Sequence, residues 1–423
     1  MIGEHTVTVT PVGGAPVDVS CLVDDVTIRQ GRDDTGSQPE AAGATINVSC
    51  DSDVTPWPAV VDVGAAVVVT TTLDGVAHTR FVGTVTDLSL GWQEAGPETP
   101  DRVQAQVVAV GPLADLGRRT VGDVPWPQQL DGARVAAIMA AAGITLDPLT
   151  SDPGTVEVLA RDVDSQTALD LAHEVAQDAG GLLWATTAGD IRYADAVHRR
   201  GVTPSLVLDA CDVLVTPTWS RTTEGMVNAV SIGYGVAPEG GEVPRYVAQR
   251  DDSIARWGTF GITSTTQLAA RSDAVALGDL LLVQNHDPVW IMGNLPVAVS
   301  DLAHADTVAL LALETHDLIQ VTGLPAAGSV PTSTSLWVEG WTETLTFGRH
   351  DLELVVSGYC RTAPPPRWND VDPATTWDTV AGTWDGAACL GPSQNLGRWD
   401  DVPATTRWDT VDPATTWDTY TGG

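Results

Sequence analysis

The chain has 423 residues, enough for about three domains of roughly 100–200 residues each. Hydrophobic residues make up 43% of it, so the sequence can bury a core and is not wholly disordered. Its 55 acidic residues outnumber 21 basic residues, all of them arginine, and the formal charge is −34. This charge argues against a protein that wraps nucleic acid or docks on an anionic membrane, because both depend on clustered basic side chains.

Residues 1–112 are predicted to form a first β-barrel domain. Val and Thr alternate near the start, and later runs rich in the same residues are separated by Pro and Gly turns. Short strands at this spacing are typical of a small barrel or sandwich. The expected later strands are 44–50, 65–72, 81–90 and 103–110.

Residues 113–204 change character and are predicted to form a small α/β module. Asp131 can cap a first helix, which Gly143 would end. Apolar residues then recur at steps of three and four from Ala168 to Ala179, which indicates a second helix, and two glycines follow it. Asp164 or Ser165 is the expected cap of the second helix. The expected elements are a helix at 131–142, a strand at 155–160, a helix through 168–179 and a hairpin of 182–187 with 190–194.

Residues 205–360 are predicted to form a second β-barrel domain with helices. Strands are expected at 226–234 and 289–299, and helices at 267–283 and 306–313. A long hairpin of 335–347 with 351–359 ends the segment. Alternation places one set of side chains on one face of its first strand, and the apolar members are expected to pack on a core or on a neighbouring subunit. This set is Trp337, Glu339, Trp341, Glu343, Leu345 and Phe347.

Residues 361–423 are predicted to form an extended tail, with a stiff Pro linker followed by a Trp-Asp-Thr repeat. This tail contains six of the fifteen tryptophans but no Ile, Phe or Met, so it is too poor in aliphatic residues for a core of its own. The repeat can be a tether to neighbouring proteins, a glycan-binding segment or an extension without a partner. Its candidate partner-binding residues are Trp368, Trp377, Trp399, Trp408 and Trp417.

The sequence offers no recognisable catalytic motif, and no cofactor or metal site is predicted. His173 starts a zinc-protease pattern, but Gln177 occupies the place of the second histidine. The pairs at 286–287 and 316–317 each join a His to an Asp, and turn or surface roles are expected for them. Loop capping is expected for the acidic residues at 33–34 and 51–53. Paired carboxylates for sugar hydrolysis stay open, because such partners can be distant in sequence.

Several short phrases follow one another in a distinctive order. They are VTIRQGR at 26–32, AGATINV at 42–48, FVGTV at 81–85, the helix and strand pair of 168–194, VNAV at 227–230, DSIARWG at 252–258 and VEGW at 338–341. In this order they resemble the hub proteins of phage tail tips and baseplates, particularly minor tail proteins of phages that infect actinobacteria. The resemblance covers about 1–360.

The resemblance implies a structural virion protein of the tail tip and not an enzyme. Such hubs have two tube-like barrels in each chain, and a homotrimer presents six barrels to a sixfold tail tube. The implied partners are the tail tube, distal tail proteins and, through 361–423, other tip proteins. DNA is expected to pass without specific binding, and no membrane anchoring is expected.

The excess of acidic residues fits a DNA exit channel, because like charge repels a passing nucleic acid. The alternative is that acidity only keeps the protein soluble. Two other functions stay open at this stage. One is a host cell-wall glycan-binding adhesin, and the other is a cell-wall-degrading tail enzyme.

Overall fold

The structure is a computed structural model that describes residues 4–34, 36–51, 61–93, 102–144, 146–147, 149–163, 165–199, 203–212, 218–239, 241–324 and 332–358. The chain divides into two compact units, Met1–Pro364 and Pro365–Gly423, and all described residues belong to the first. The predicted Trp repeat therefore lies outside the described residues. Within the ranges given, no helix has the length and apolar character that a membrane crossing requires.

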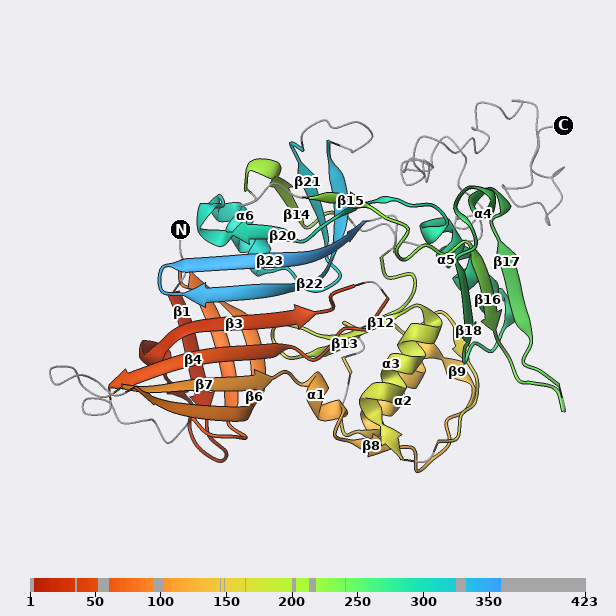
Figure 1. Ribbon diagram of the computed structural model, residues 1–423. Coiled ribbons are helices and arrows are strands. Elements are labelled where there is room, and N and C mark those ends of the chain that lie inside the picture. Colours follow the sequence, from red (N-terminus) through yellow and green to blue (C-terminus); the bar gives the residue numbers. More distant parts are fainter. Residues whose placement is uncertain are drawn as a thin grey trace. The chain divides into compact units, whose positions relative to one another are not determined.

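Twelve strands pair into one large, mostly antiparallel sheet (Figure 1). Seven come from the N-terminal segment: β1 (Glu4–Thr10), β2 (Val17–Asp18), β3 (Val23–Gly31), β4 (Gly43–Asp51), β5 (Ala66–Leu73), β6 (Val76–Gln93) and β7 (Arg102–Val110). Five come from later in the chain: β14 (Leu206–Asp209), β20 (Leu295–Ala298), β21 (Leu318–Thr322), β22 (Thr334–Thr346) and β23 (Arg349–Gly358). The mainly β class is confirmed, and closure of either half into a barrel stays a prediction.

Strands rich in Val and Thr form the N-terminal half of this sheet. In β5 every second side chain is buried, because β-branched residues fit a pleated surface that is covered on one face. The buried side chains of this half include Ile28, Ile46, Val69 and Phe81, and Leu345 of β22 packs among them. A second cluster, which includes Leu295, Ile319 and Val338, lies beneath the C-terminal half.

Strand β22 connects the two halves of the sheet. Its N-terminal part pairs with β21, its C-terminal part pairs with β3, and β23 runs along its other edge. The segments predicted as two separate barrels therefore share hydrogen-bonded strands. The pairing of β3 with β22 joins residues that are about three hundred positions apart in the sequence.

A β-bulge at Glu339 interrupts β22. Val338 pairs with Val356 of β23, whereas Gly340 pairs with the next residue of that strand, Val355. The extra residue reverses the alternation of side chains along the strand. Sequence alternation alone cannot detect this reversal.

The bulge corrects the prediction of a single face on this strand. Trp341 packs into the C-terminal core together with Leu336 and Val338, which even spacing would place on the opposite face from it. Trp337 instead lies beneath the guanidinium of Arg199. Phe347 lies beyond the end of β22 and is fully exposed, so it packs on no core.

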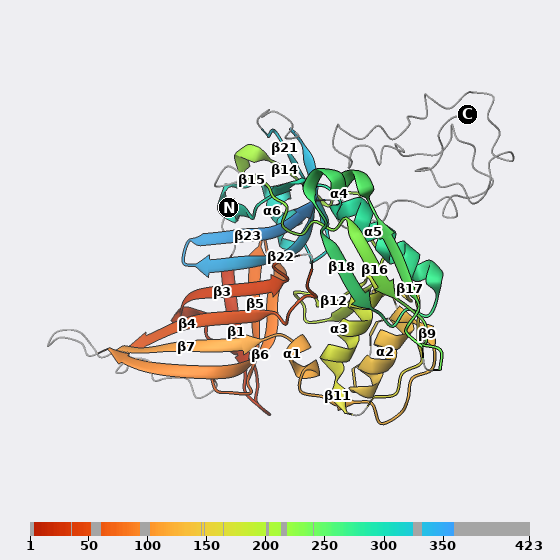
Figure 2. The same ribbon diagram turned by 45° about the vertical axis from the view of Figure 1, so that its right-hand side comes forward.

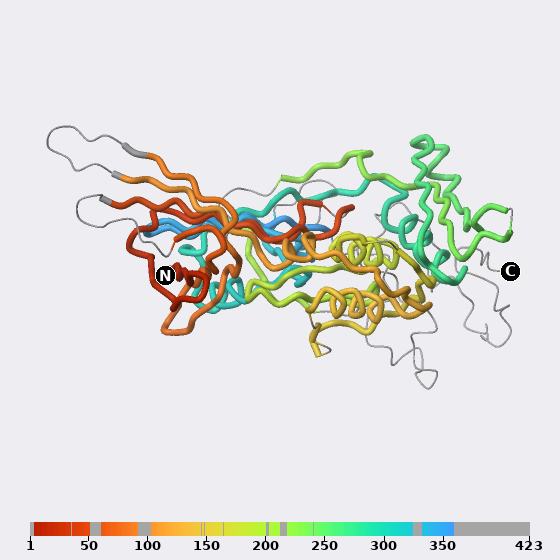
Figure 3. Tube along the Cα trace, turned by 90° about the horizontal axis from the view of Figure 1, so that it is seen from below, coloured from red at the N-terminus to blue at the C-terminus, as the bar shows by residue number. Residues whose placement is uncertain are grey.

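The described residues of the α/β module form three helices and a small hairpin: α1 (Leu113–Leu116), α2 (Asp131–Ala141), α3 (Ala168–Ala179), β12 (Leu182–Ala185) and β13 (Ile191–Ala194). Helices α2 and α3 lie side by side (Figure 3). The cap of α3 is Thr167, whose side chain accepts from the Asp170 amide, and not Asp164 or Ser165. Strand β11 (Gln166–Thr167) occupies the residues just before α3, so the helix begins at Ala168, later than the expected cap would place it. Gly180 ends α3 at a φ of +73°.

A separate three-stranded sheet forms from residues that were predicted as part of the second barrel. Its strands are β16 (Ala229–Gly233), β17 (Arg245–Gln249) and β18 (Gly261–Thr265), and Figure 2 shows them beside α5 (Arg271–Asn285). These elements have a core of their own, whose buried residues are Val230, Ile232, Leu268, Ala274 and Leu282. Helix α4 (Asp251–Trp257) precedes β18.

Short elements complete the described fold. The expected strand at 289–299 is divided into β19 (Trp290–Met292) and β20, and β19 pairs with β15 (Trp219–Arg221). The expected helix at 306–313 begins earlier, as α6 (His304–Leu311). The remaining short elements are η1 (Ser20–Leu22), β8 (Thr120–Val121), β9 (Gln129–Leu130), β10 (Glu157–Val158), η2 (Ala210–Asp212) and η3 (Val299–Asp301).

Candidate functional site

Two glutamates on β22, Glu339 and Glu343, are almost completely buried, with 1% and 0% of their surface exposed. A buried carboxylate is stable only when charged and hydrogen-bonding partners replace the water it has lost. Each glutamate has such partners, and they come from distant parts of the chain. The two groups are called the Glu339 cluster and the Glu343 cluster below.

The Glu339 cluster contains two arginines, a serine and a histidine. Arg32, just after β3, donates its Nε to Oε2 of Glu339 at 2.8 Å. Arg199, after β13, donates Nη1 to Oε1 at 2.9 Å and Nη2 to Oε2 at 3.0 Å. Ser357 of β23 donates its hydroxyl to Oε1, and Arg199 also contacts Nδ1 of His316. The cluster therefore fastens the module to both halves of the large sheet.

Electrostatics keep this carboxylate ionised. Burial would raise the pKa of Glu339, but the charges of Arg199 and Arg32 outweigh that effect and hold this pKa well below its usual range. Burial and the neighbouring Arg199 lower the pKa of His316 well below its ordinary value. His316 is therefore neutral, and its ring meets Trp184 edge to face at 4.7 Å between centroids.

The Glu343 cluster lies farther along the same strand. Arg80 of β6 donates its Nε to both carboxylate oxygens of Glu343 at 3.0 Å and its Nη1 to the Leu311 carbonyl at 2.6 Å. Nε2 of His350 lies 2.7 Å from Glu343 Oε1. The ring of His5, on β1, meets that of His350 edge to face at 5.1 Å. These contacts join the side chains of four strands of the large sheet, β1, β6, β22 and β23.

A second bulge directs Arg80 into the protein. Val69 pairs with Phe81, whereas Thr70 pairs with Thr79, so Arg80 is the extra residue on β6. Burial would raise the pKa of Glu343, but Arg80 and the hydrogen bond from His350 lower it to about 2. Burial, and next the charge of His350, lower the pKa of His5 to about 4.

Further hydrogen bonds add to the attachment of the module. Gln38 donates to the Gly181 carbonyl at 3.0 Å and accepts from the Leu183 amide at 3.3 Å. On the other side, the carboxylate of Glu314 accepts from the hydroxyl of Thr187 at 3.0 Å. Together with the Glu339 cluster, these bonds make the module and the sheet a jointly stabilised framework.

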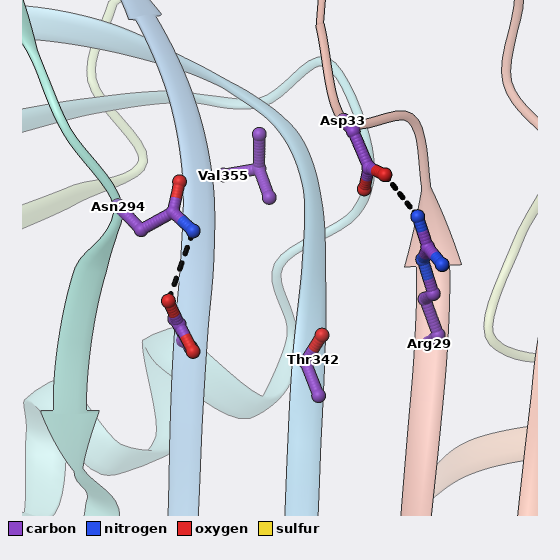
Figure 4. A pocket seen from close by; sticks show the side chains of 6 residues that line it. Arg29, Asp33, Asn294, Thr342 and Val355 are labelled. Carbon is purple, nitrogen blue, oxygen red and sulfur yellow. Dashed lines mark hydrogen bonds and ion pairs between the residues drawn. The ribbon is translucent and has the colours of Figure 1, made fainter.

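A hollow of about 310 Å³ opens on the face of β3, β22 and β23 (Figure 4). Asn294 donates its Nδ2 to Glu353 Oε1 at 2.9 Å, and Arg29 is paired with Asp33. Four of the polar side chains that line the hollow therefore pair with one another, which is typical of a sheet surface rather than of a ligand site. The lining is Arg29, Asp33, Asn294, Thr342, Glu353 and Val355.

The residues singled out for chemistry are dispersed among structural roles. His173 lies on α3, and its neighbour Glu174 forms a salt bridge with Arg161 at 2.8 Å. Asp34 accepts from two loop amides, in agreement with the expected capping. His286 and His316 were expected in turn or surface roles. His286 lies at the bend after α5 and His316 at the turn before β21, and both side chains are buried. Nδ1 of His286 lies 2.8 Å from the Leu282 carbonyl, and the ring of His316 packs against Trp184. In the described ranges, no group of three or more His, Cys, Asp or Glu side chains could hold a metal ion.

Sequence reasoning missed the two clusters. Glu339 and Glu343 were noticed on a strand face among apolar residues, and a charged residue at a core position is the signal that predicts a buried ion pair. Their partners Arg32, Arg80 and Arg199 carry no such signal, since their burial depends on bulges and long-range pairing. The five tryptophans proposed for partner binding lie outside the described residues.

The fold is that of phage tail proteins. One similar solved structure is the 43 kDa tail protein of prophage MuSo2 from Shewanella oneidensis, with a TM-score of 0.57 and 11% identity; the match covers 86% of this chain and 99% of that one. Another is a tail protein from Neisseria meningitidis MC58, with a TM-score of 0.57 and 10% identity; the match covers 85% of this chain and 98% of that one. Prophage tail protein gp18 from Listeria monocytogenes EGD-e has a TM-score of 0.52 and 9% identity over 82% and 94%. No family model and no curated protein matches the sequence. At these identities the likeness establishes the fold alone, and it agrees with the resemblance seen in the sequence.

Proposed function

We propose that the chain is a structural protein of the virion, a tail hub that joins a sixfold tail tube to the tail tip as a homotrimer. The observation that carries this proposal is the fold shared with three tail proteins, two of them from prophages, over at least 82% of the chain. The likeness runs through nearly the whole length of each of those proteins, so it is not confined to one common motif. An actinobacterial host is proposed from the sequence phrases alone.

The internal construction suits a mechanical part. Both β-rich segments share β22, and the two buried clusters tie the module and four strands to it. Breaking such a buried pair is costly, because it leaves an uncompensated charge in the interior. The framework therefore resists separation of its parts when a tube above and a tip below pull on it.

The charge distribution supports a channel that DNA crosses without binding. In the N-terminal half of the sheet, Arg29, Arg32 and Arg80 are each bound to a carboxylate. Exposed acidic residues such as Asp24 and Asp74 have no such arginine in the described contacts. A phosphate backbone gains affinity only from basic side chains that are free to displace its counterions.

The mass of the purified full-length chain tests the hub. Native mass spectrometry is expected to show three copies of the 44.3 kDa polypeptide, and a reconstruction of that trimer is expected to show a mostly negative bore. A monomer both in solution and in the virion would refute the hub. A neutral or arginine-lined bore would remove the channel argument and leave acidity as a solubility feature.

The two alternative functions predict different results with the same preparation. An adhesin binds cell-wall glycans on an array, and a wall-degrading enzyme releases soluble fragments from purified peptidoglycan. The hub is expected to give neither signal. Either signal from 1–364 would replace the proposed function, whereas glycan binding that requires 365–423 would assign it to the Trp repeat.

A further inference from the structure

Phe347, at the tip of the β22–β23 hairpin, is the most exposed large apolar side chain in the described part of the chain. Its exposed fraction is 104%, whereas Phe81 in the N-terminal core is 1% exposed. A ring left in water forfeits the whole hydrophobic gain that burial would provide. Single exposed apolar side chains are ordinary on protein surfaces. This one is an aromatic ring at a hairpin tip, and aromatic rings, Phe included, are enriched at the centres of protein interfaces.

The hairpin holds this ring in a defined place. Thr346 pairs with Arg349, which leaves Phe347 and Gly348 as the turn. Gly348 has a φ of +77°, a backbone conformation that favours glycine and fixes the sharp turn. The Glu343 cluster anchors the strands directly behind the tip. Because the ring is presented by an ordered base, docking it costs little conformational entropy.

Acidic side chains flank the tip. Asp25 of β3 lies opposite Thr346, and Asp24 precedes it. The hydrogen-bond donors to both carboxylates are neutral side chains of β4. Arg349, the basic residue next to the turn, is bound to Asp351. The surroundings of the ring therefore carry a net negative charge.

We propose that Phe347 docks into an apolar pocket with a basic rim on a neighbouring protein of different sequence. The flanking carboxylates require a partner with positive charge around its pocket. A second copy of this chain is a poor partner for this ring, because its own tip carries the same acidic flank and its hollow on β3, β22 and β23 has a polar lining. The occupant is therefore a different polypeptide of the same assembly.

The setting of this proposal rests on the proposed function, since the neighbour is a virion protein. The experiment puts the photo-crosslinking residue p-benzoylphenylalanine in place of Phe347 in the full chain and illuminates assembled virions. A second version carries it in place of Leu149, which is 92% exposed and lies in the module. One specific adduct with a different virion protein is expected from position 347 and not from position 149.

Other outcomes separate the two proposals. Absence of the chain from purified virions refutes the virion role, whatever the crosslinking shows. If the chain is present, an adduct with a second copy overturns the docking proposal, and so does an adduct yield no higher than at Leu149.

Conventional substitutions provide a readout that does not depend on the crosslinker. Phe347→Ser is expected to lower incorporation of the neighbouring protein by about tenfold or more, as for an aromatic hot spot. Leu149→Ser should leave incorporation unchanged, and circular dichroism should show that both variants are folded. Equal incorporation in the two variants overturns the proposal.

The acidic flank has its own test. The double variant Asp24→Asn and Asp25→Asn is expected to weaken association with the crosslinked neighbour several-fold at low salt. The difference should shrink at high salt, because exposed charges are screened there. An unchanged or stronger association at low salt contradicts a basic rim.

Discussion

At the scale of single residues, the buried charges of β22 distinguish this protein most sharply from an ordinary β-sheet. Two glutamates on one strand are held by three arginines, and every one of these five side chains is at least nine-tenths buried. The pairs need not raise net stability, because desolvation offsets much of their attraction. They favour one arrangement of the chain over others, since any arrangement that separates the partners leaves an unmatched charge in the interior.

Replacing Glu339 by Gln is therefore expected to destabilise the protein by about 3–5 kcal/mol, because Arg32 and Arg199 lose their shared counter-charge in the interior. Chemical denaturation followed by circular dichroism measures this change. Asp33→Asn is the matched control, because its partner Arg29 and Asp33 itself are 59% and 63% exposed. The control is expected to change stability by less than about 1 kcal/mol, and equal effects would contradict the argument.

The dependence of stability on pH follows from His5 and Glu343. The pKa of His5 is about 4 in the fold and 6.5 when unfolded, so the unfolded chain binds a proton first as the pH falls. The contribution of neutral His5 to the free energy of unfolding is complete above pH 6.5 and is lost as the pH falls from 6.5 to about 4. The pKa of Glu343, lowered from 4.5 to about 2, gives a contribution that is lost between those values.

Acid should thus destabilise the fold in two successive ranges. Four carboxylates act in the opposite direction, because burial favours their protonation in the fold. It raises the pKa of Asp178 to about 6 and also raises the pKa values of Asp195, Glu314 and Asp317. The measurement is the midpoint of urea unfolding from pH 7 to 4 for the natural chain and for His5→Gln. A smaller slope is expected in the variant, and an identical slope would show that His5 does not contribute.

At the scale of elements, two bulges decide which side chains enter the interior. The bulge on β6 turns Arg80 inward, and the bulge on β22 lets Glu339 and Glu343 serve two different clusters. The β22 bulge also brings two backbones unusually close. Gly31 has a φ of +83°, and a Cβ on it would lie 2.3 Å from the Glu339 carbonyl oxygen.

Gly340→Ala tests this close approach. A Cβ at Gly340 would lie 2.4 Å from the backbone oxygen of Gln30, so strands β3 and β22 must separate, at a cost of about 1–3 kcal/mol. Thermal unfolding measures the loss. Gly43→Ala on β4 is the control, since nothing lies within 4 Å of its added Cβ and its φ is not positive. If both variants melt alike, the contact between β3 and β22 is not tight.

At the scale of the whole molecule, the described residues form one unit that ends near the Pro run. The unit boundary falls between Pro364 and Pro365, close to the linker predicted at 361. The large sheet, the module and the three-stranded sheet all lie before this boundary. The framework and the repeat can therefore be tested separately. The hub is proposed for the framework, and the attachment of other tip proteins is proposed for the repeat.

Deleting 368–423 is accordingly expected to leave the melting temperature and the proposed trimer unchanged, because every packed core among the described residues precedes the deletion. Incorporation of neighbouring tip proteins is expected to fall, since Trp368, Trp377, Trp399, Trp408 and Trp417 are the proposed anchors. Native mass spectrometry and the protein content of purified particles measure the two effects. Particles of normal composition from the deletion would refute the tether.

Local patterns predicted most of the secondary structure. The alternating Val and Thr of β1 and the spacing in α3 are short-range signals, because a strand or helix face repeats within a few residues. The cap of α3 and the split of 289–299 were missed, since neighbouring strands β11 and β19 set those boundaries. Phe347 was expected to pack on a core or subunit, and the described fold leaves it exposed.

The amino-acid sequence by itself determined the acidic charge, the β-rich class, the helices of the module and the separate composition of the tail, because these depend on composition and on neighbours a few positions away. Only the tertiary structure decided that both β-rich segments share one sheet, that the three-stranded sheet has its own core, and which arginines are buried beside Glu339 and Glu343. The physical reason is that one inserted residue reverses a strand's faces, and pairing across about three hundred positions selects the partners. Neither the inserted residue nor the long-range pairing produces a periodic pattern in the sequence.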